Sequence, residues 1–170
     1  MRAILAGGDR RSIGRSDEVV DRVRAHPKSF AQLVECLWDS DPCVSMRAAD
    51  AIEKLTRESA ARLQKHKKEL LGLMAETRQK EVRWHLAVIL PRLELTPAEC
   101  RYTEAILRAY LNDGSSIVKT FALQGLVDLT QQNLRLVAPV IELLREATRS
   151  GTAAMRARAR ILLRKLEPPR

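Results

Sequence analysis

The fold is decided by the stretch from Asp41 to Leu55, which reads DPCVSMRAADAIEKL. An aspartate that can cap a helix precedes Pro42, and apolar or small side chains then recur at offsets 0, 4, 7, 8 and 11 counted from Val44. At about 100° per residue, these offsets fall on one stripe of an α-helix. The stretch therefore predicts an amphipathic helix that buries one face.

The same apolar template recurs with starts at Val82, Val118 and Met155, which gives spacings of 38, 36 and 37 residues from Val44 onward. The template residues are Val44, Ala48, Ala51, Ile52 and Leu55; Val82, Leu86, Ile89, Leu90 and Leu93; Val118, Ala122, Gly125, Leu126 and Leu129; and Met155, Ala159, Leu162, Leu163 and Leu166. A period of this length is typical of stacked helix pairs, because one pair cannot bury its own apolar face. The sequence thus predicts an all-α fold, an α-α superhelix of about four helix pairs.

A second, more variable helical pattern precedes each template helix. Ser29 with Gln32 and Thr96 with Glu99 have the spacing of capping boxes, which mark helix starts. The pattern predicts a short helix near 16–25, a basic Gly/Arg segment over 1–15, a single domain over 16–167 and a tail over 168–170.

Two stretches carry a family resemblance. Asp41–Ile52 resembles the second helix of a HEAT repeat, in which an Asp-Pro turn leads into a valine, a nearby arginine and a stripe of alanine and leucine. Val137–Leu144 resembles the first helix of such a repeat. The resemblance covers residues 27–167 as four units. It implies a right-handed α-solenoid whose second helices line a concave surface, and a protein that binds other macromolecules.

The composition bears on membrane association, on the redox state of the cysteines and on cofactor binding. The chain has 170 residues and a formal charge of +9, and no apolar run is long enough to predict a membrane span. Cys36, Cys43 and Cys100 form no CxxC pair, which favours a reduced, cytoplasmic protein. The three histidines show no ligand spacing, so we expect neither a metal nor another cofactor.

The face opposite the template stripe is the predicted binding surface. Offsets 2, 6 and 9 point away from the stripe and would line the concave side. The predicted partner-binding residues are Trp84, Val88, Asp50, Gln124 and Ile161. Trp84 beside Val88 indicates an apolar anchor for a partner; alternatively, tight curvature or the N-terminal segment covers Trp84. Trp38 lies close to another apolar stripe and is expected in the core.

Basic residues on the flanks of the same helices suggest a second surface. A stripe of stacked cations at Arg47, Arg83, Arg92, Lys119, Arg156 and Arg158 would track a polyanion. The alternative is that the arginines hydrogen-bond between neighbouring units. Five cations between residues 156 and 165 either give the last helix a polar outer face or contact an acidic partner. The glycines and arginines of residues 7–16 form either an anion-binding loop or an entry loop that packs on the first unit.

No paired carboxylates, nucleophile with base, or metal cluster can be identified, so we expect no enzymatic activity. The sequence predicts a non-catalytic scaffold that binds an unidentified protein partner through its concave face. Nucleic-acid or acidic-segment binding by the basic flanks is the first alternative. A HEAT-like alkylpurine DNA glycosylase, with Asp50 and Trp84 in its site, is a more distant one.

Overall fold

The computed structural model describes residues 1–9 and 12–167 of the chain, and these residues are 79% helical. In these residues there are ten α-helices and no strand. The helices are α1 (Arg2–Leu5), α2 (Ser16–Ala25), α3 (Phe30–Glu35), α4 (Pro42–Glu58), α5 (Lys67–Glu76), α6 (Lys80–Ile89), α7 (Pro97–Tyr110), α8 (Ser116–Leu129), α9 (Val137–Ser150) and α10 (Ala153–Leu166). Short 3-10 helices precede or follow several of them, and the predicted 168–170 tail lies outside the described residues.

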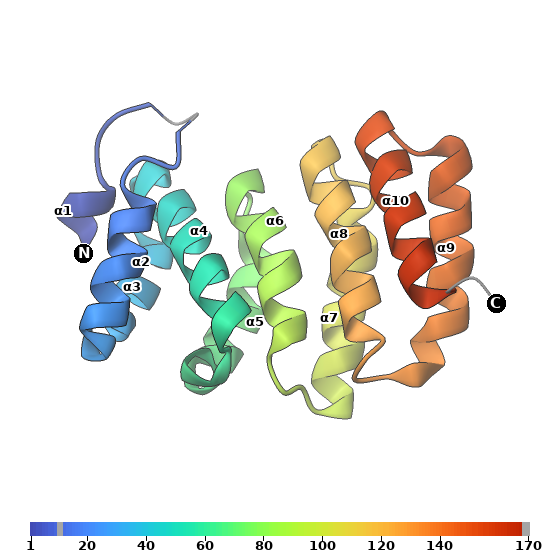
Figure 1. Ribbon diagram of the computed structural model, residues 1–170, viewed down its shortest axis with the longest axis horizontal. Coiled ribbons are helices and arrows are strands. Elements are labelled where there is room, and N and C mark those ends of the chain that lie inside the picture. Colours follow the sequence, from blue (N-terminus) through green and yellow to red (C-terminus); the bar gives the residue numbers. More distant parts are fainter. Residues whose placement is uncertain (10–11, 168–170) are drawn as a thin grey trace.

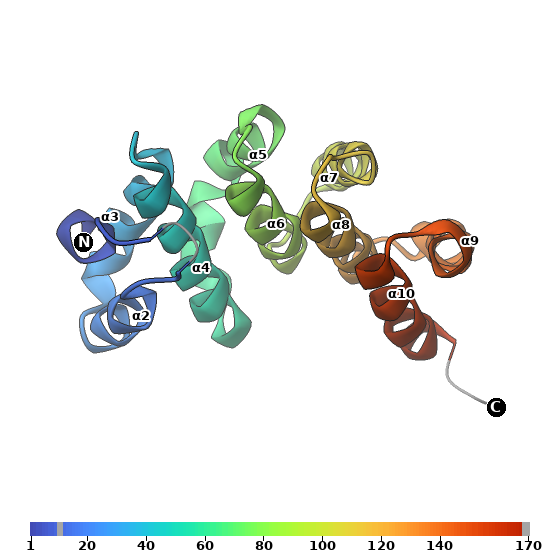
Figure 2. The same ribbon diagram turned by 90° about the horizontal axis from the view of Figure 1, so that it is seen from above.

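The helices form two layers that follow the order of the sequence along the long axis of the molecule (Figures 1 and 2). One layer contains α2, α4, α6, α8 and α10, and each of these helices packs against the next in the row. The other layer contains α3, α5, α7 and α9, each packed on the template helix that follows it. The apolar core lies between the layers and is continuous along the row.

The apolar template describes this core correctly. All fifteen template residues of α4, of α6 with the 3-10 turn after it, and of α8 are buried. In α10, Ala159 and Leu162 are buried, whereas Met155, Leu163 and Leu166 are half-buried. The reason is that α10 packs on α8 and α9, and no helix of the described residues follows it in the row.

Helix α2 also fits the template, which the sequence analysis missed. Counted from Ser12, its buried residues Ser16, Val19, Val20 and Val23 occupy offsets 4, 7, 8 and 11. The match was hidden because the helix is short, offset 0 is a serine, and the spacing to the next template start is 32 residues rather than 36–38. The helix itself was predicted with correct bounds.

Local capping explains where α4 and α7 begin. Asp41 accepts a hydrogen bond from the Cys43 amide at 2.8 Å, and Pro42 occupies the first helical position of α4. The capping box of Thr96 and Glu99 is confirmed at the start of α7. The box predicted for Ser29 and Gln32 is wrong, because the Ser29 hydroxyl donates to the His26 carbonyl and a 3-10 turn leads into α3.

Hydrogen bonds between successive helix pairs join residues at similar sequence separations. The Ser45 hydroxyl bonds Gln79, the hydroxyls of Ser116 and Thr152 bond each other, and Gln132 donates to the Leu93 carbonyl. These separations are 34, 36 and 39 residues. These bonds therefore join residues at similar places in successive helix pairs.

The prediction that Trp38 belongs to the core is wrong. Its side chain lies in the 3-10 turn Cys36–Trp38 and is 48% exposed. The helix ends before Trp38, so the helical spacing that aligned it with the buried residues Phe30, Leu33 and Val34 no longer applies.

Candidate functional site

The open face of the template layer is rotated away from the position predicted. Neighbouring template helices lie side by side, so their flanks cover much of offsets 2 and 9. In α8, for example, Thr120 and Val127 are buried, whereas Ile117 is exposed and Phe121, Gln124 and Asp128 are half-buried. The prediction that Val88 lies on the open face is likewise wrong, since Val88 is 4% exposed.

A groove on this face contains Trp84. We call it the Trp84 groove; it has a volume of about 370 Å³ and is lined by Ser12, Ile13, Met46, Arg47, Asp50, Lys80, Glu81, Trp84, His85 and Ile117. These residues come from the N-terminal loop and from α4, α6 and α8. Of the five predicted partner-binding residues, the groove brings together Trp84 and Asp50.

One side of the Trp84 groove is apolar. Ile13 and Ile117 are each 46% exposed, and Trp84 is half-buried against the core. Met46, which is buried, also lines the groove. An apolar cluster that remains open to solvent on several elements is characteristic of a binding surface. Sequence analysis identified Trp84 but missed the two isoleucines.

The other side of the groove is polar, and its side chains are held by hydrogen bonds and ion pairs. Asp50 Oδ2 accepts hydrogen bonds from Ser16 Oγ at 2.5 Å and from Lys54 Nζ at 2.7 Å. Burial alone would raise the pKa of Asp50, but the interactions with His85, Lys54 and Ser16 outweigh it and hold that pKa well below its usual range. Asp50 therefore remains a carboxylate at neutral and mildly acidic pH.

His85 connects the two sides of the groove. Its Nδ1 lies 2.7 Å from the Glu81 carbonyl oxygen, one turn earlier in α6. Its Nε2 lies 3.3 Å from Trp84 Nε1 and 3.8 Å from Asp50 Oδ1. The indole and imidazole rings are tilted by 47° with their centroids 5.5 Å apart.

The N-terminal loop forms one wall of the groove and is organised around Arg47. The guanidinium donates to the carbonyls of Leu5 (2.7 Å), Gly7, Asp9 (2.9 Å) and Ser12 (3.1 Å). Arg47 is 2% exposed, so its predicted place on an exposed polyanion-binding flank is wrong.

The glycines of this loop bring its carbonyls inward. Gly7, Gly8 and Gly14 adopt positive φ angles of 77°, 76° and 55°, and a Cβ on Gly14 would lie 2.7 Å from the Arg47 guanidinium. The described loop residues thus surround a cation with carbonyl oxygens, which supports the entry-loop alternative over the anion-binding loop. Arg10 and Arg11, which belong to the predicted Gly/Arg segment, lie outside the described residues.

The remaining predicted partner-binding residues lie farther along the layer. Gln124 on α8 donates to Asp128 Oδ1 at 2.7 Å. Ile161 on α10 is 45% exposed but does not line the Trp84 groove. These two side chains therefore do not belong to the candidate site.

Most of the predicted polyanion-binding cations have partners within the fold. Arg83 donates to Asp113 at 2.6 Å in the next helix pair, as the alternative of a bond between units anticipated. Arg92 pairs with Glu53 at 2.5 Å, and Arg156 donates to the Gly151 carbonyl at 2.7 Å. Arg158 lies 6.0 Å from the centre of the Phe121 ring. Lys119 is half-buried.

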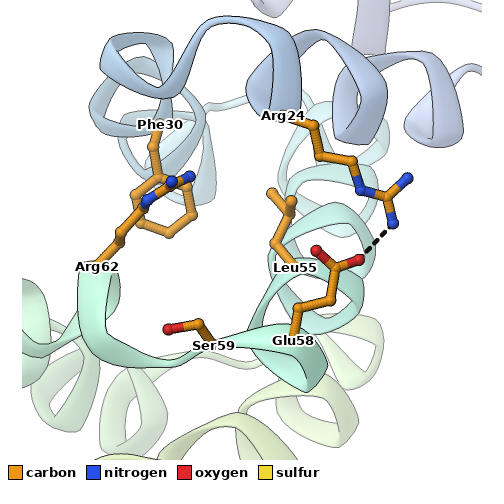
Figure 3. Close-up of a pocket in the computed structure, with 6 residues that line it drawn as sticks. All are labelled: Arg24, Phe30, Leu55, Glu58, Ser59 and Arg62. Carbon is orange, nitrogen blue, oxygen red and sulfur yellow. Dashed lines mark hydrogen bonds and ion pairs between the residues drawn. The ribbon is translucent and has the colours of Figure 1, made fainter.

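A second hollow lies beyond the C-terminal end of α4 (Figure 3). It has a volume of about 220 Å³ and is lined by Arg24, Phe30, Leu55, Glu58, Ser59 and Arg62. An Arg24–Glu58 ion pair spans one side, and the apolar residues Phe30 and Leu55 are buried. The hollow thus offers a ligand little apolar surface, and the Trp84 groove is the better candidate site.

Residues 1–9 and 12–167 contain neither a metal-binding cluster nor a membrane-spanning helix. No three His, Cys, Asp or Glu side chains converge there as a metal site requires. Among the described helices, none combines the length and hydropathy needed to cross a membrane.

Neither a protein-family model, nor a curated protein, nor a solved structure matches the chain.

Proposed function

We propose that the chain is a HEAT-like α-solenoid of helix pairs that acts as a non-catalytic binding module. Three observations support the architecture: the template positions are buried, the template helices pack in sequence order, and bonds between pairs recur at separations of 34–39 residues. In such an array each unit buries the apolar face of its neighbour, and the open side of one layer is available to a partner.

The partner in this proposal is a protein segment that inserts an apolar side chain against Trp84. The observation that carries it is the 370 Å³ groove in which Ile13, Trp84 and Ile117 converge from three separate elements. Tryptophan is one of the residues most enriched in interface hot spots. The polar wall of Asp50 and His85 would orient the segment.

Protein is favoured over nucleic acid by the charges of the site. Asp50 and Glu81 place two carboxylates on the groove wall and balance its two cations, Arg47 and Lys80, so the lining has no excess of positive charge to attract a phosphate backbone. Three of the cations proposed for a phosphate stripe, Arg47, Arg83 and Arg92, already donate to carbonyls or carboxylates of the fold. The same geometry does not favour a glycosylase, because Asp50 Oδ2 is held by Ser16 and Lys54.

Trp84→Ala is expected to weaken binding of a groove peptide by about 30-fold, because truncation of a tryptophan hot spot costs about 2 kcal/mol or more. Peptides would be selected against the purified chain from a displayed random library, and their affinity measured by fluorescence anisotropy. Ile117→Ser should also weaken binding. Trp38→Phe is the matched control, because Trp38 is exposed outside the groove, and it should leave affinity unchanged.

Thermal unfolding separates binding from folding in this experiment. Trp84 is only half-buried, so Trp84→Ala should retain a cooperative transition close to that of the parent. Peptides that bind equally well to Trp84→Ala would place the binding surface elsewhere. Duplex or single-stranded DNA that binds with a steep salt dependence, unaffected by Trp84→Ala, would favour the nucleic-acid alternative.

A further inference from the structure

We propose that His85 is a proton-operated switch that fixes or releases Trp84 in the groove. In the neutral state His85 holds the indole N–H of Trp84; in the charged state it turns its own N–H to Asp50. Its effect on peptide affinity rests on the function proposed above, whereas the switch itself rests only on the contacts of His85.

The hydrogen bonds of His85 assign its neutral tautomer. The Glu81 carbonyl can only accept, so Nδ1, at 2.7 Å from it, carries the proton. A neutral imidazole has one proton, and Nε2 is therefore an acceptor. The group positioned to donate to it is the Trp84 Nε1–H, at 3.3 Å. Neutral His85 thus fixes the rotation of the indole ring.

Protonation of His85 makes this contact unfavourable. A charged imidazolium carries protons on both nitrogens, so the Nε2–H and the Trp84 Nε1–H would point at each other. The nearest carboxylate oxygen is Asp50 Oδ1, 3.8 Å from Nε2. Both other donors to Asp50, Ser16 and Lys54, bond to its Oδ2, so Oδ1 is oriented toward His85.

The charges around His85 come from two helices. On α4, Arg47 and Asp50 line the groove, and Lys54 is bonded to Asp50. On α6, Lys80 and Glu81 line it. The N-terminal loop and α8 contribute only the uncharged Ser12, Ile13 and Ile117 among the described residues. Of these groups, Asp50 is the carboxylate closest to Nε2.

Release of Trp84 would alter the groove. The indole N–H would lose its acceptor, and the ring would no longer be held at its tilt to the imidazole. A preorganised anchor surface binds more tightly than a mobile one, because less side-chain freedom is lost on association. Acidification through the titration of His85 should therefore weaken binding of a groove peptide by about 5-fold, a typical effect of one hydrogen bond.

Trp84 fluorescence measures the switch without any ligand. The chain has two tryptophans, so Trp38→Phe leaves Trp84 as the sole indole reporter. Its emission should change in a single one-proton step between about pH 8 and pH 5, the range in which histidine titrates, because a charged imidazolium quenches a nearby indole. Nitrogen NMR shifts at high pH should show the proton of His85 on Nδ1.

Three variants in the Trp38→Phe background identify the titrating group. His85→Gln should abolish the emission step, whereas His66→Gln, at a half-buried histidine outside the groove, should retain it. Asp50→Asn should reduce the size of the emission step, since it removes the carboxylate toward which the Nε2–H would turn. An emission step that survives His85→Gln, or a neutral His85 with its proton on Nε2, would overturn the switch.

Peptide binding at two pH values separates the switch from the proposed function. If the emission step depends on His85 but no peptide requires Trp84, the switch stands and the binding function fails. If Trp84-dependent peptides bind equally at pH 8 and pH 5 and the emission step is absent, the function stands and the switch fails. His85→Gln should make the affinity of such peptides independent of pH over this range.

Discussion

Gly125→Ala is expected to destabilise the protein by about 3 kcal/mol, although alanine is the better helix former by about 1 kcal/mol. Gly125 lies in the middle of α8, where an added Cβ would be 2.1 Å from the carbonyl oxygen of Ala87 and 3.0 Å from Leu107 Cδ2. The Ala87 oxygen belongs to the backbone of α6 and cannot rotate away. The methyl group fits only if α6 and α8 move apart.

Gly72→Ala is the matched control for this prediction. Gly72 also lies inside a helix, α5, but no atom is within 4 Å of the position of its added Cβ. Gly72→Ala should therefore stabilise the protein by about 0.5–1 kcal/mol through helix propensity and loss of unfolded-state entropy. Urea unfolding followed by circular dichroism measures both variants. Equal effects of the two substitutions would show that α6 and α8 are not in contact at Gly125.

The apolar template could be predicted from sequence because it depends on short-range geometry. A stripe at offsets 0, 4, 7, 8 and 11 defines one face of a helix whatever lies around it, and that face has to be buried. Val44, Leu86 and Ala122 accordingly have no exposed surface. The helix starts at Asp41 and Thr96 could also be predicted from the sequence, since a cap involves only neighbouring residues.

The position of the open face could not be predicted in the same way. It depends on how far each template helix is rotated relative to the next, and this rotation is set by packing between helices rather than within them. Val88 was expected in solvent for this reason, yet it is buried. Ile117 belongs to the site because α8 carries it to the edge of the groove, and no local pattern marked it.

The polar half of the site was the least predictable. The role of His85 depends on Glu81, Trp84 and Asp50 at once, and Asp50 comes from a different helix. The nearest available signal was the spacing of 35 residues between Asp50 and His85, close to the template period. Such a spacing places residues on neighbouring helices but does not say which side chains meet.

The N-terminal glycines allowed two interpretations from sequence, an anion-binding loop or an entry loop that packs on the first unit. Glycine-rich loops can turn either amides or carbonyls toward a ligand, and in the structure the described loop residues turn their carbonyls toward a cation. The cation that the loop binds is Arg47, 33 residues after Gly14 in the sequence. It lies on a helix whose periodicity placed Arg47 on a solvated flank.

Arg47→Met is therefore expected to destabilise the N-terminal part of the fold by about 3 kcal/mol. Hydrogen bonds from a charged group contribute about 1.5–3 kcal/mol each, and four carbonyls lose their donor together, although water can reach some of them once the loop opens. Amide hydrogen exchange should show residues 1–15 losing protection. Arg47→Lys should be intermediate, since an ammonium has three donors and lacks the planar fork that reaches all four oxygens.

Arg57→Met on the same helix is the control, because the Arg57 side chain is 67% exposed and its partner Glu53 keeps Arg92. This variant should change stability by less than about 1 kcal/mol. If Arg47→Met behaved in the same way, the loop would be held by its apolar contacts, chiefly Leu5, rather than by the guanidinium. If the loop does open, Ser12 and Ile13 leave the wall of the Trp84 groove, so the affinity of a groove peptide should fall together with the protection of the loop amides.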